Sequence, residues 1–512
     1  MADRETSRRS FIVGAGAAAI CGICGLPHIA CREADGAGAE APVRAKGKLL
    51  KLLGVGEGVF RPTADGATIH WIPNGEVESE LLTGTSGNDL KIVRSVVSSV
   101  PVELQIDGLS GAAEVFWSAR HRRKGEQKWV NSPVRSFKTC RQKGESFQAA
   151  LFADSHFYSV RNRAQSLGNI QKCMNAVQKA RPDFCVFLGD EAGVQYVTDE
   201  KTQDQALARE RWLNWREYIG PLLSEVPSFL VLGNHEGEAG FYRDQDRARK
   251  VFLQRWGTIE RKRHYLNPLP STYAEGGENQ NWKGNQKSGA TGGADEGNCS
   301  PFQNYFAWTW GDALFVVLDV HRYTNPGKST PAVPEEWTLG RTQLKWLEQV
   351  LKNSDARWKF VIAHHVVGGS RWDLNCKVEK SGYAYGRGGA RYARVGEQAK
   401  VTDLMKRYGS RFFVYGHDHI FAHQEAEGIH FVCCGRPTKV PGGWVQEEGF
   451  IEAYGDFRAR DPHDFYLDVG YTKLTVSPSE VVFEYIKTGM DPEGNENTAA
   501  KVGDVVHRVV VT

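Results

Sequence analysis

The chain has 512 residues, of which 41% are hydrophobic and 11% aromatic, so it can bury the cores of two or three domains and is not a disordered protein. Its 64 lysine and arginine residues nearly balance 61 aspartate and glutamate residues, which excludes the broad positive surface typical of a nucleic-acid-binding protein. We therefore expect no nucleic-acid partner. After the leader no continuous apolar run is long enough to cross a bilayer, so no membrane span is expected in the mature protein.

The N-terminal segment, residues 1–39, is expected to be a leader and not part of the fold. Arg8 and Arg9 precede a Phe-Ile pair and a weakly apolar stretch rich in Gly and Ala. This pattern resembles a twin-arginine signal, which implies export of the folded chain by that machinery to the periplasm, the cell surface or the medium. Cleavage is expected after Ala39, and lipidation of Cys31 is the alternative.

Residues 48–139 show short strand-like runs separated by turn signals, which favours an all-β sandwich. Trp71 and Trp117 lie in two of these runs and are expected in its core, because aromatic residues on alternating strands usually pack inward. Over residues 145–490 strands alternate with helical patterns, which indicates an α/β domain. Residues 491–512 remain as a C-terminal tail or strand.

Three of the ten cysteines lie in the leader. Cys173 and Cys185 fall in apolar helix and strand patterns and are expected to be buried thiols. Cys299 and Cys376 lie in loops of an exported chain, where a disulfide between them and two separate thiols are both open alternatives.

Five short blocks of the α/β region place polar side chains where an apolar strand ends. They read FQAALFADSHF, FCVFLGDE, SFLVLGNHE, KFVIAHH and RFFVYGHDH. Strand ends of an α/β sheet converge on one crevice, so these side chains are expected to meet. Their carboxylate, amide and imidazole groups suit divalent or trivalent ions of Fe, Zn, Mn or Co. The candidate metal ligands are Asp154, His156, Asp190, Asn234, His364, His417 and His419.

Two ions roughly 3.5 to 4 Å apart need a ligand that binds both. Asp190 is the expected bridge, because a carboxylate has two oxygens whereas a neutral imidazole offers one nitrogen to a metal.

The blocks D-x-H, G-D, G-N-H-[DE], a later His and G-H-x-H occur in this order between Asp154 and His419. The chain thereby resembles the calcineurin-like metallophosphoesterase superfamily, which implies a four-layered α/β/β/α sandwich. Of the neighbouring His364 and His365, the first corresponds to the family's ligand. The resemblance implies one ion on Asp154, His156, Asp190 and His419, and a second on Asp190, Asn234, His364 and His417.

The resemblance also implies a mechanism in which a metal-activated hydroxide attacks the phosphate and His235 protonates the leaving oxygen. In the protein-phosphatase relatives an Asp three residues after the bridging Asp orients this histidine, but here that position is Gly193. Glu191 or Glu236 is expected to take its place.

The segment VELQIDGLSGAAEVFWSARHRR through SFKT resembles the fibronectin type III-like domain that precedes the catalytic domain of purple acid phosphatases. Those enzymes have Gly where His156 stands and a Tyr ligand at the position of Gly193. A coloured tyrosinate–iron site is therefore not expected.

Substrate choice is expected to depend on long insertions, in which Arg371, Arg387 and Tyr385 are candidate contacts to a small phosphorylated substrate. These insertions are residues 257–300, 321–336 and 366–394. The leading function is an exported phosphomonoesterase. The alternatives are a phosphodiesterase acting on nucleotides or glycerophosphodiesters, and a cell-surface binding protein with a structural metal site.

Overall fold

The structure of the protein is a computed structural model that describes residues 48–157, 163–194, 205–236, 253–268, 305–320, 339–365, 395–438 and 465–512. Residues 41–512 form one compact unit. The leader, Cys299 and Cys376 lie outside the described residues. Among the helices that are described, none combines the length and the apolar character needed to cross a membrane.

The N-terminal domain is a sandwich of two antiparallel sheets, as expected from its short strands. After α2 (Lys48–Leu52), one sheet has the order β1-β2-β5 and consists of β1 (Leu53–Phe60), β2 (Ala67–Pro73) and β5 (Val102–Ile106). The other has the order β4-β3-β6-β7, with β8 also on β6, and consists of β3 (Val77–Gly84), β4 (Lys91–Ser98), β6 (Glu114–Arg123), β7 (Val130–Asn131) and β8 (Arg135–Lys138). Trp71 and Trp117 are fully buried in the core between the sheets, which confirms that prediction.

The second domain contains two larger sheets. The first has the order β11-β10-β9-β19-β20-β21 and consists of β9 (Phe147–Phe152), β10 (Phe184–Phe187), β11 (Ser228–Leu230), β19 (Gly470–Val476), β20 (Val481–Lys487) and β21 (Val505–Val511). The second has the order β12-β13-β14-β15-β17-β16-β18 and consists of β12 (Phe306–Trp310), β13 (Ala313–Val317), β14 (Trp358–Ile362), β15 (Phe412–Tyr415), β16 (Phe421–Ala426), β17 (Ile429–Cys433) and β18 (Phe465–Tyr466). Strands β9, β10 and β11 are parallel to one another, and so are β13, β14, β15 and β17. The carboxyl ends of these seven strands are therefore available to build a site.

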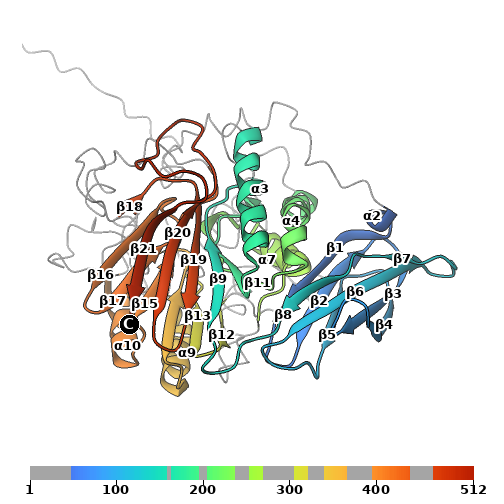
Figure 1. Ribbon diagram of the computed structural model, residues 1–512, viewed down its shortest axis with the longest axis horizontal. Helices are drawn as coiled ribbons and strands as arrows, with labels where there is room; N and C mark the ends of the chain where they lie inside the picture. The colour runs from blue at the N-terminus through green and yellow to red at the C-terminus, as the bar shows by residue number, and fades with distance from the viewer. Residues whose placement is uncertain are drawn as a thin grey trace, which may run out of the picture. The chain divides into compact units, whose positions relative to one another are not determined.

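Helices cover the outer face of each large sheet (Figure 1). The six-stranded sheet packs against α3 (Arg163–Ala180), α4 (Gln205–Tyr218), α5 (Gly220–Leu223) and the segment that follows α7 (Leu253–His264). The seven-stranded sheet packs against α9 (Gly340–Asn353) and α10 (Val395–Arg407). In α9, Trp346, Leu347, Val350 and Leu351 recur at helical spacing, and all four are buried against the sheet. The predicted α/β/β/α arrangement is confirmed.

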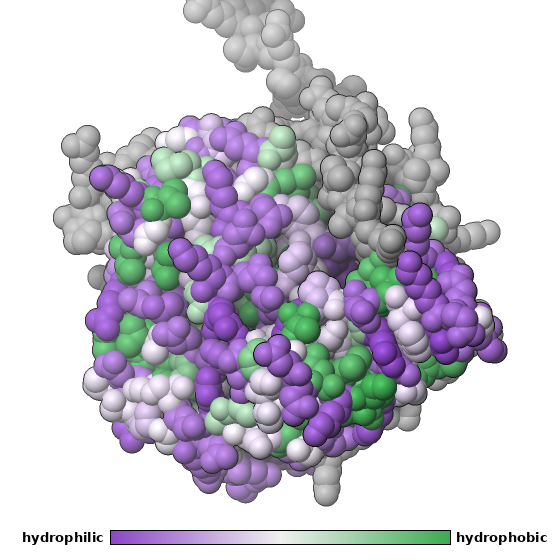
Figure 2. Space-filling view, turned by 45° about the vertical axis from the view of Figure 1, so that its right-hand side comes forward, coloured by the Kyte–Doolittle hydropathy of each residue, from purple (hydrophilic) through white to green (hydrophobic). Residues whose placement is uncertain are grey.

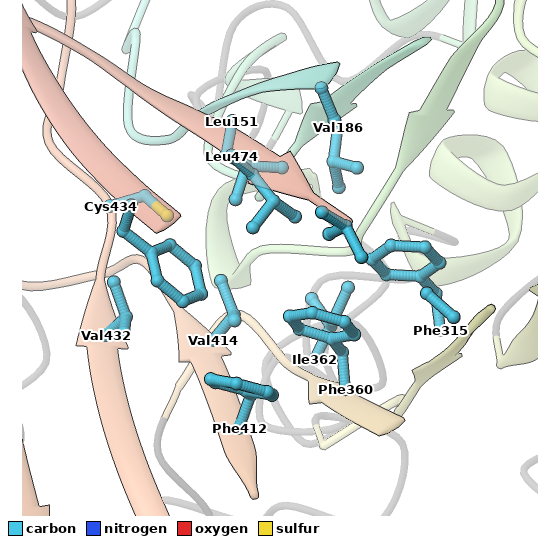
Figure 3. Packing of buried hydrophobic residues seen from close by; sticks show 14 of the residues in the cluster. Leu151, Val186, Phe315, Phe360, Ile362, Phe412, Val414, Val432, Cys434 and Leu474 are labelled. Atoms are coloured by element: carbon cyan, nitrogen blue, oxygen red, sulfur yellow. The ribbon is translucent and has the colours of Figure 1, made fainter. Parts of the chain in front are cut away.

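The inner faces of the two large sheets form a dry core (Figure 3). In this core the ring of Phe360 stacks between Phe315 and Phe412, with centroid distances of 4.8 and 4.6 Å. Leu151 and Leu474 face these rings from the six-stranded sheet. Strands buried on both faces must be apolar throughout, which explains why their sequences read as continuous runs of Phe, Val and Ile.

Figure 2 shows one face of the surface, on which hydrophilic residues predominate and apolar residues occur in small separate patches. Buried Cys173 and Cys185 lie in the core beneath α3, as expected for structural thiols.

Candidate metal centre

The predicted ligands follow the carboxyl ends of parallel strands, and most of them have an unusual backbone. A positive φ is uncommon for a residue other than Gly and is concentrated at functional sites. The five with positive φ are Asp154 (57°), His156 (45°), Asp190 (61°), His417 (70°) and His419 (62°). These residues therefore lie in the turns that follow β9, β10 and β15.

One cluster consists of Asp154, His156, Asp190 and His419, each of which is buried and offers one ligand atom within 4.8 Å of the others. Nε2 of His419 lies 2.9 Å from Nε2 of His156 and 3.1 Å from Oδ1 of Asp154. These are the four residues that the sequence assigned to the first ion.

A second cluster consists of His364, His365 and His417. Asp190 lies between the two clusters, because its Oδ2 is 3.6 Å from Nε2 of His156 and 3.2 Å from Nε2 of His364. This is the arrangement expected of a bridging carboxylate.

The backbone of Asn234 begins the 3₁₀ turn η3 (Asn234–Glu236) directly after β11, and its side chain lies outside the described part of the structure. His365 lies beside His364 in the cluster, with its ring centroid 3.5 Å from that of His417. The structure therefore brings both neighbouring histidines to the site, whereas the sequence favoured the first.

The two carboxylates are held in the same way. Oδ2 of Asp154 accepts a hydrogen bond from the backbone N–H of His417 (2.7 Å), and Oδ1 of Asp190 accepts one from that of His235 (2.8 Å). The remaining oxygens, Oδ1 of Asp154 and Oδ2 of Asp190, are buried without a hydrogen-bond partner among the described residues. Such oxygens are costly to bury unless a cation satisfies them, so the donor set fits metal ions.

The electrostatics of the site also favour a cation. Burial alone would raise the pKa of Asp190, but His235, His364 and His156 hold that pKa well below its usual value. Burial alone would lower the pKa of His364, but Asp190 and Asp154 raise it to about 10. The two carboxylates thus create a negative potential where Nε2 of His364 lies.

Hydrogen bonds behind the ligands fix their orientation. Nδ1 of His364 donates to the carbonyl of Leu188 (2.6 Å), so Nε2 is the ring nitrogen that faces Asp190 and would bind an ion. The carboxylate of Glu236 accepts hydrogen bonds from the backbone N–H groups of Gly233 (2.6 Å), Asp190 (2.9 Å) and Glu191 (2.7 Å). Glu236 therefore links the loops that follow β10 and β11.

Asp190 and His156 lie next to the side chain of His235. Its Nε2 lies 3.6 Å from Oδ2 of Asp190, and its ring packs edge-on against His156 with a centroid distance of 4.8 Å. Glu191 accepts a hydrogen bond from the hydroxyl of Ser155, and burial raises its pKa well above the usual value.

Arg436 is not among the residues that the sequence motifs select; it follows β17 and is buried beside the first cluster. Its Nη1 donates to Nδ1 of His419 (2.7 Å), and its Nε donates to the hydroxyl of Thr438 (2.6 Å). A neutral imidazole has one nitrogen with a free lone pair, and in His419 the hydrogen bond from Arg436 uses the lone pair of Nδ1. For an ion to bind Nε2, either Arg436 would have to leave Nδ1 or the ring would have to lose its remaining N–H proton. The one signal for it in the sequence is the apolar run that precedes it, because β17 ends at the same edge as β15, but no motif marks the residue.

The candidate substrate contacts Arg371, Tyr385 and Arg387 lie outside the described residues. Their role stays a prediction.

Comparison with known proteins gives a family model and solved structures that match this chain. Residues 147–421, more than half of the chain, match the family model described as calcineurin-like phosphoesterase. The fold is similar to the solved structure of PhoD, with a TM-score of 0.61, 15% sequence identity and coverage of 90% of both chains. GAP50, the anchor in the inner membrane complex of Plasmodium, aligns over 71% of this chain and 88% of its own at 12% identity, with a TM-score of 0.35. The search of curated proteins gives no match.

Proposed function

Because the chain belongs to the calcineurin-like phosphoesterase family, whose model matches residues 147–421, we propose that it is an exported phosphatase that hydrolyses phosphate monoesters of small molecules. The observation that carries the proposal is the position of Oδ2 of Asp190, which is buried 3.6 Å from Nε2 of His156 in the first cluster and 3.2 Å from Nε2 of His364 in the second. A purely structural ion needs one closed set of ligands and no bridge to a second set.

Each ion is assigned its own ligands. The first ion would be held by Asp154, His156, Asp190 and His419, and the second by Asp190, Asn234, His364 and His417, with Fe, Zn, Mn or Co as candidates. When bound, two such ions supply an activated water and positive charge for an in-line displacement at phosphorus. The chain's part is to keep the ligands rigid through the backbone hydrogen bonds to Asp154 and Asp190.

His235 is assigned the proton transfer to the leaving oxygen. Its ring is buried against His156 of the first cluster, and its Nε2 lies 3.6 Å from Oδ2 of Asp190. A positioned histidine next to the reacting centre is the usual general acid near neutral pH.

A pair of chromogenic substrates tests the reaction. The purified protein, loaded separately with each candidate metal, is assayed with p-nitrophenyl phosphate and with bis-p-nitrophenyl phosphate. We expect kcat/KM to be at least about tenfold higher for the monoester, a difference of about 1.4 kcal/mol in the barrier. A preference for the diester would replace the proposal with a phosphodiesterase. Two bound ions without activity on either ester would favour the binding protein.

Export is tested with the leader. A chain carrying Arg8→Lys together with Arg9→Lys is expected to fold and remain active but to stay inside the cell, because this export machinery reads the arginine pair. Cell fractionation with an activity assay provides the measurement. Unchanged export of the double variant would contradict the assigned route.

A further inference from the structure

The side chain of Asn267 takes the place of a neighbouring strand at β11. Asn267 follows α7 and is fully buried. Its Oδ1 accepts a hydrogen bond from the backbone N–H of Leu230 (2.9 Å), and its Nδ2 donates to the carbonyl of the same residue (2.8 Å). In the described part of the sheet β11 is the edge strand, paired on its other side with β10. A side-chain amide has the same donor and acceptor as a peptide unit, so this contact satisfies the strand edge as a backbone would.

The segment that carries Asn267 is held by the N-terminal sandwich. Arg61, at the end of β1, donates from Nε to the backbone carbonyl of Asn267 (2.8 Å), and its Nη1 pairs with Glu103 of β5 (2.8 Å). Next to it, the ring of Phe60 packs edge-on against Tyr265, with a centroid distance of 5.1 Å. Three successive contacts therefore connect the sandwich with β11. They join Glu103 to Arg61, Arg61 to Asn267, and Asn267 to Leu230.

Strand β11 leads straight into the metal centre. Three residues after Leu230, the N–H of Gly233 donates to the carboxylate of Glu236 (2.6 Å), and the N–H of His235 donates to Oδ1 of Asp190 (2.8 Å). Gly233 and the carboxylate of Asp190 are in close contact, because a Cβ at Gly233 would lie 2.2 Å from Oδ1 of Asp190. Any displacement of β11 along its axis is passed on to the loop that carries Asn234 and His235.

We propose that Asn267, held in place by Arg61, is a positioning residue for this loop and that the sandwich thereby sets the placement of His235. The proposal rests on the proposed function for the role of His235 but not for the clamp itself. Without the amide, the N–H and C=O of Leu230 are buried without partners, and the strand relieves this by moving or by admitting water. A displacement of about 1 Å at a reacting group is enough to cost about a hundredfold in rate.

The first test measures the clamp without any reaction. Hydrogen exchange is followed in peptides covering residues 228–236 for the wild type, Asn267→Ala, Arg61→Ala and Arg61→Lys. We expect exchange in this segment to become at least about tenfold faster in both alanine variants, and Arg61→Lys to restore part of the protection. The matched control is Arg181→Ala, which removes another contact with the sandwich, to Glu114, far along the chain from this loop. Wild-type exchange in both alanine variants overturns the proposal.

The second test separates positioning from general destabilisation. The same variants are assayed with aryl phosphates whose phenols differ in pKa, and bound metal is counted for each. A misplaced His235 is expected to lower kcat about tenfold to a hundredfold for poor leaving groups, with good leaving groups, KM and the two bound ions little changed. Equal losses for all leaving groups overturn the proposal.

A wild type that hydrolyses none of these esters refutes the proposed function and leaves the exchange result to decide on the clamp. Arg61→Ala provides the answer if Asn267→Ala does not fold.

Discussion

At the scale of single residues, the loop after β10 leaves no room for a side chain at Gly189. Its φ is +100°, and a Cβ there would lie 2.6 Å from the backbone nitrogen of Gly233 and 2.7 Å from Nδ1 of His364. We expect Gly189→Ala to lower stability and metal content together, because the clash pushes the Asp190 loop away from His364. Thermal unfolding and metal analysis measure the two effects.

Gly503→Ala is the matched control. Gly503 has a φ of +101° and nothing within 4 Å of a built Cβ, so alanine there adds the backbone strain of about 1 kcal/mol without the clash. Equal effects of the two substitutions would show that the close approach at Gly189 has no importance.

Replacing His235 with Ala tests its assigned role. The backbone N–H of residue 235, which holds Oδ1 of Asp190, remains after this change, so both ions are expected to stay bound. Turnover should fall by about 10²- to 10⁴-fold for poor leaving groups and less for good ones, because only the former need a proton in the transition state. Stopped-assay kinetics over a series of aryl phosphates provides the measurement. An unchanged dependence on the leaving group would remove the assigned acid.

The residues that the sequence located and those that it missed differ in a physical way. Asp154, Asp190 and His364 could be predicted because each ends an apolar run, and parallel strands end at a common edge. Asn267 and Arg436 could not be predicted from a motif. Their hydrogen bonds join segments that meet only after the strands have paired in register, and no local spacing records that register.

At the scale of elements, β14 connects the hydrophobic core to the metal site, since Phe360 lies four residues before His364. Phe360→Ala is expected to destabilise the protein by about 3–5 kcal/mol, because it removes a fully buried ring that stacks between two others. Urea unfolding measures the change. The control Val505→Ala on β21, where the side chain is 47% exposed, should cost less than about 1 kcal/mol. A loss at Phe360 as small as that at Val505 would mean that the core repacks.

In the sandwich, a series of hydrogen-bonded buried polar side chains connects β1, β3 and β6. His121 lies 2.8 Å from the hydroxyl of Ser79 and 3.0 Å from the carboxylate of Glu57, and Arg135 lies 3.5 Å from the other oxygen of that carboxylate. Burial raises the pKa of Glu57, but the hydrogen bond and charge of His121 together with the charge of Arg135 outweigh it and lower the pKa to about 2. The folded state therefore prefers the ionised carboxylate.

This gives a pH dependence with a definite sign. Above pH 4.5 the contribution of Glu57 is present in full, and it is lost as the pH falls from 4.5 toward 2, because the unfolded chain takes up the proton first. The loss is on the order of 3 kcal/mol. Unfolding of the wild type and of Glu57→Gln across this range measures it. The variant should have a lower free energy of unfolding at neutral pH, and this free energy should fall less steeply than that of the wild type as the pH decreases. Parallel curves of unfolding free energy against pH for the two proteins would contradict the assignment of this dependence to Glu57.

At the scale of the whole molecule, the layers could be predicted and the docking of the domains could not. Alternating strands and helices imply a layered α/β domain, and short strands with turns imply a sandwich. One of the contacts between them is made by Arg216, a guanidinium buried in α4 that donates to the carbonyl of Gly56 in β1 (3.1 Å) and lies over the ring of Phe60. An arginine in a polar helix would ordinarily be placed in solvent, so the sequence pattern points the wrong way here.

Because Phe60 of the sandwich is part of the core beneath α3 and α4, we expect both domains to unfold in a single transition. Ions that bind only the folded protein stabilise it by about 4 kcal/mol per site at a thousandfold excess over Kd. Chelation should therefore lower the Tm of the entire transition, including the part of the fluorescence signal that Trp71 and Trp117 contribute from the sandwich. Calorimetry combined with fluorescence of the metal-loaded and chelated protein measures this shift, and metal added back should reverse it. Two transitions, of which only one responds to chelation, would show that the sandwich is energetically separate from the metal centre and would remove the basis for its control of β11.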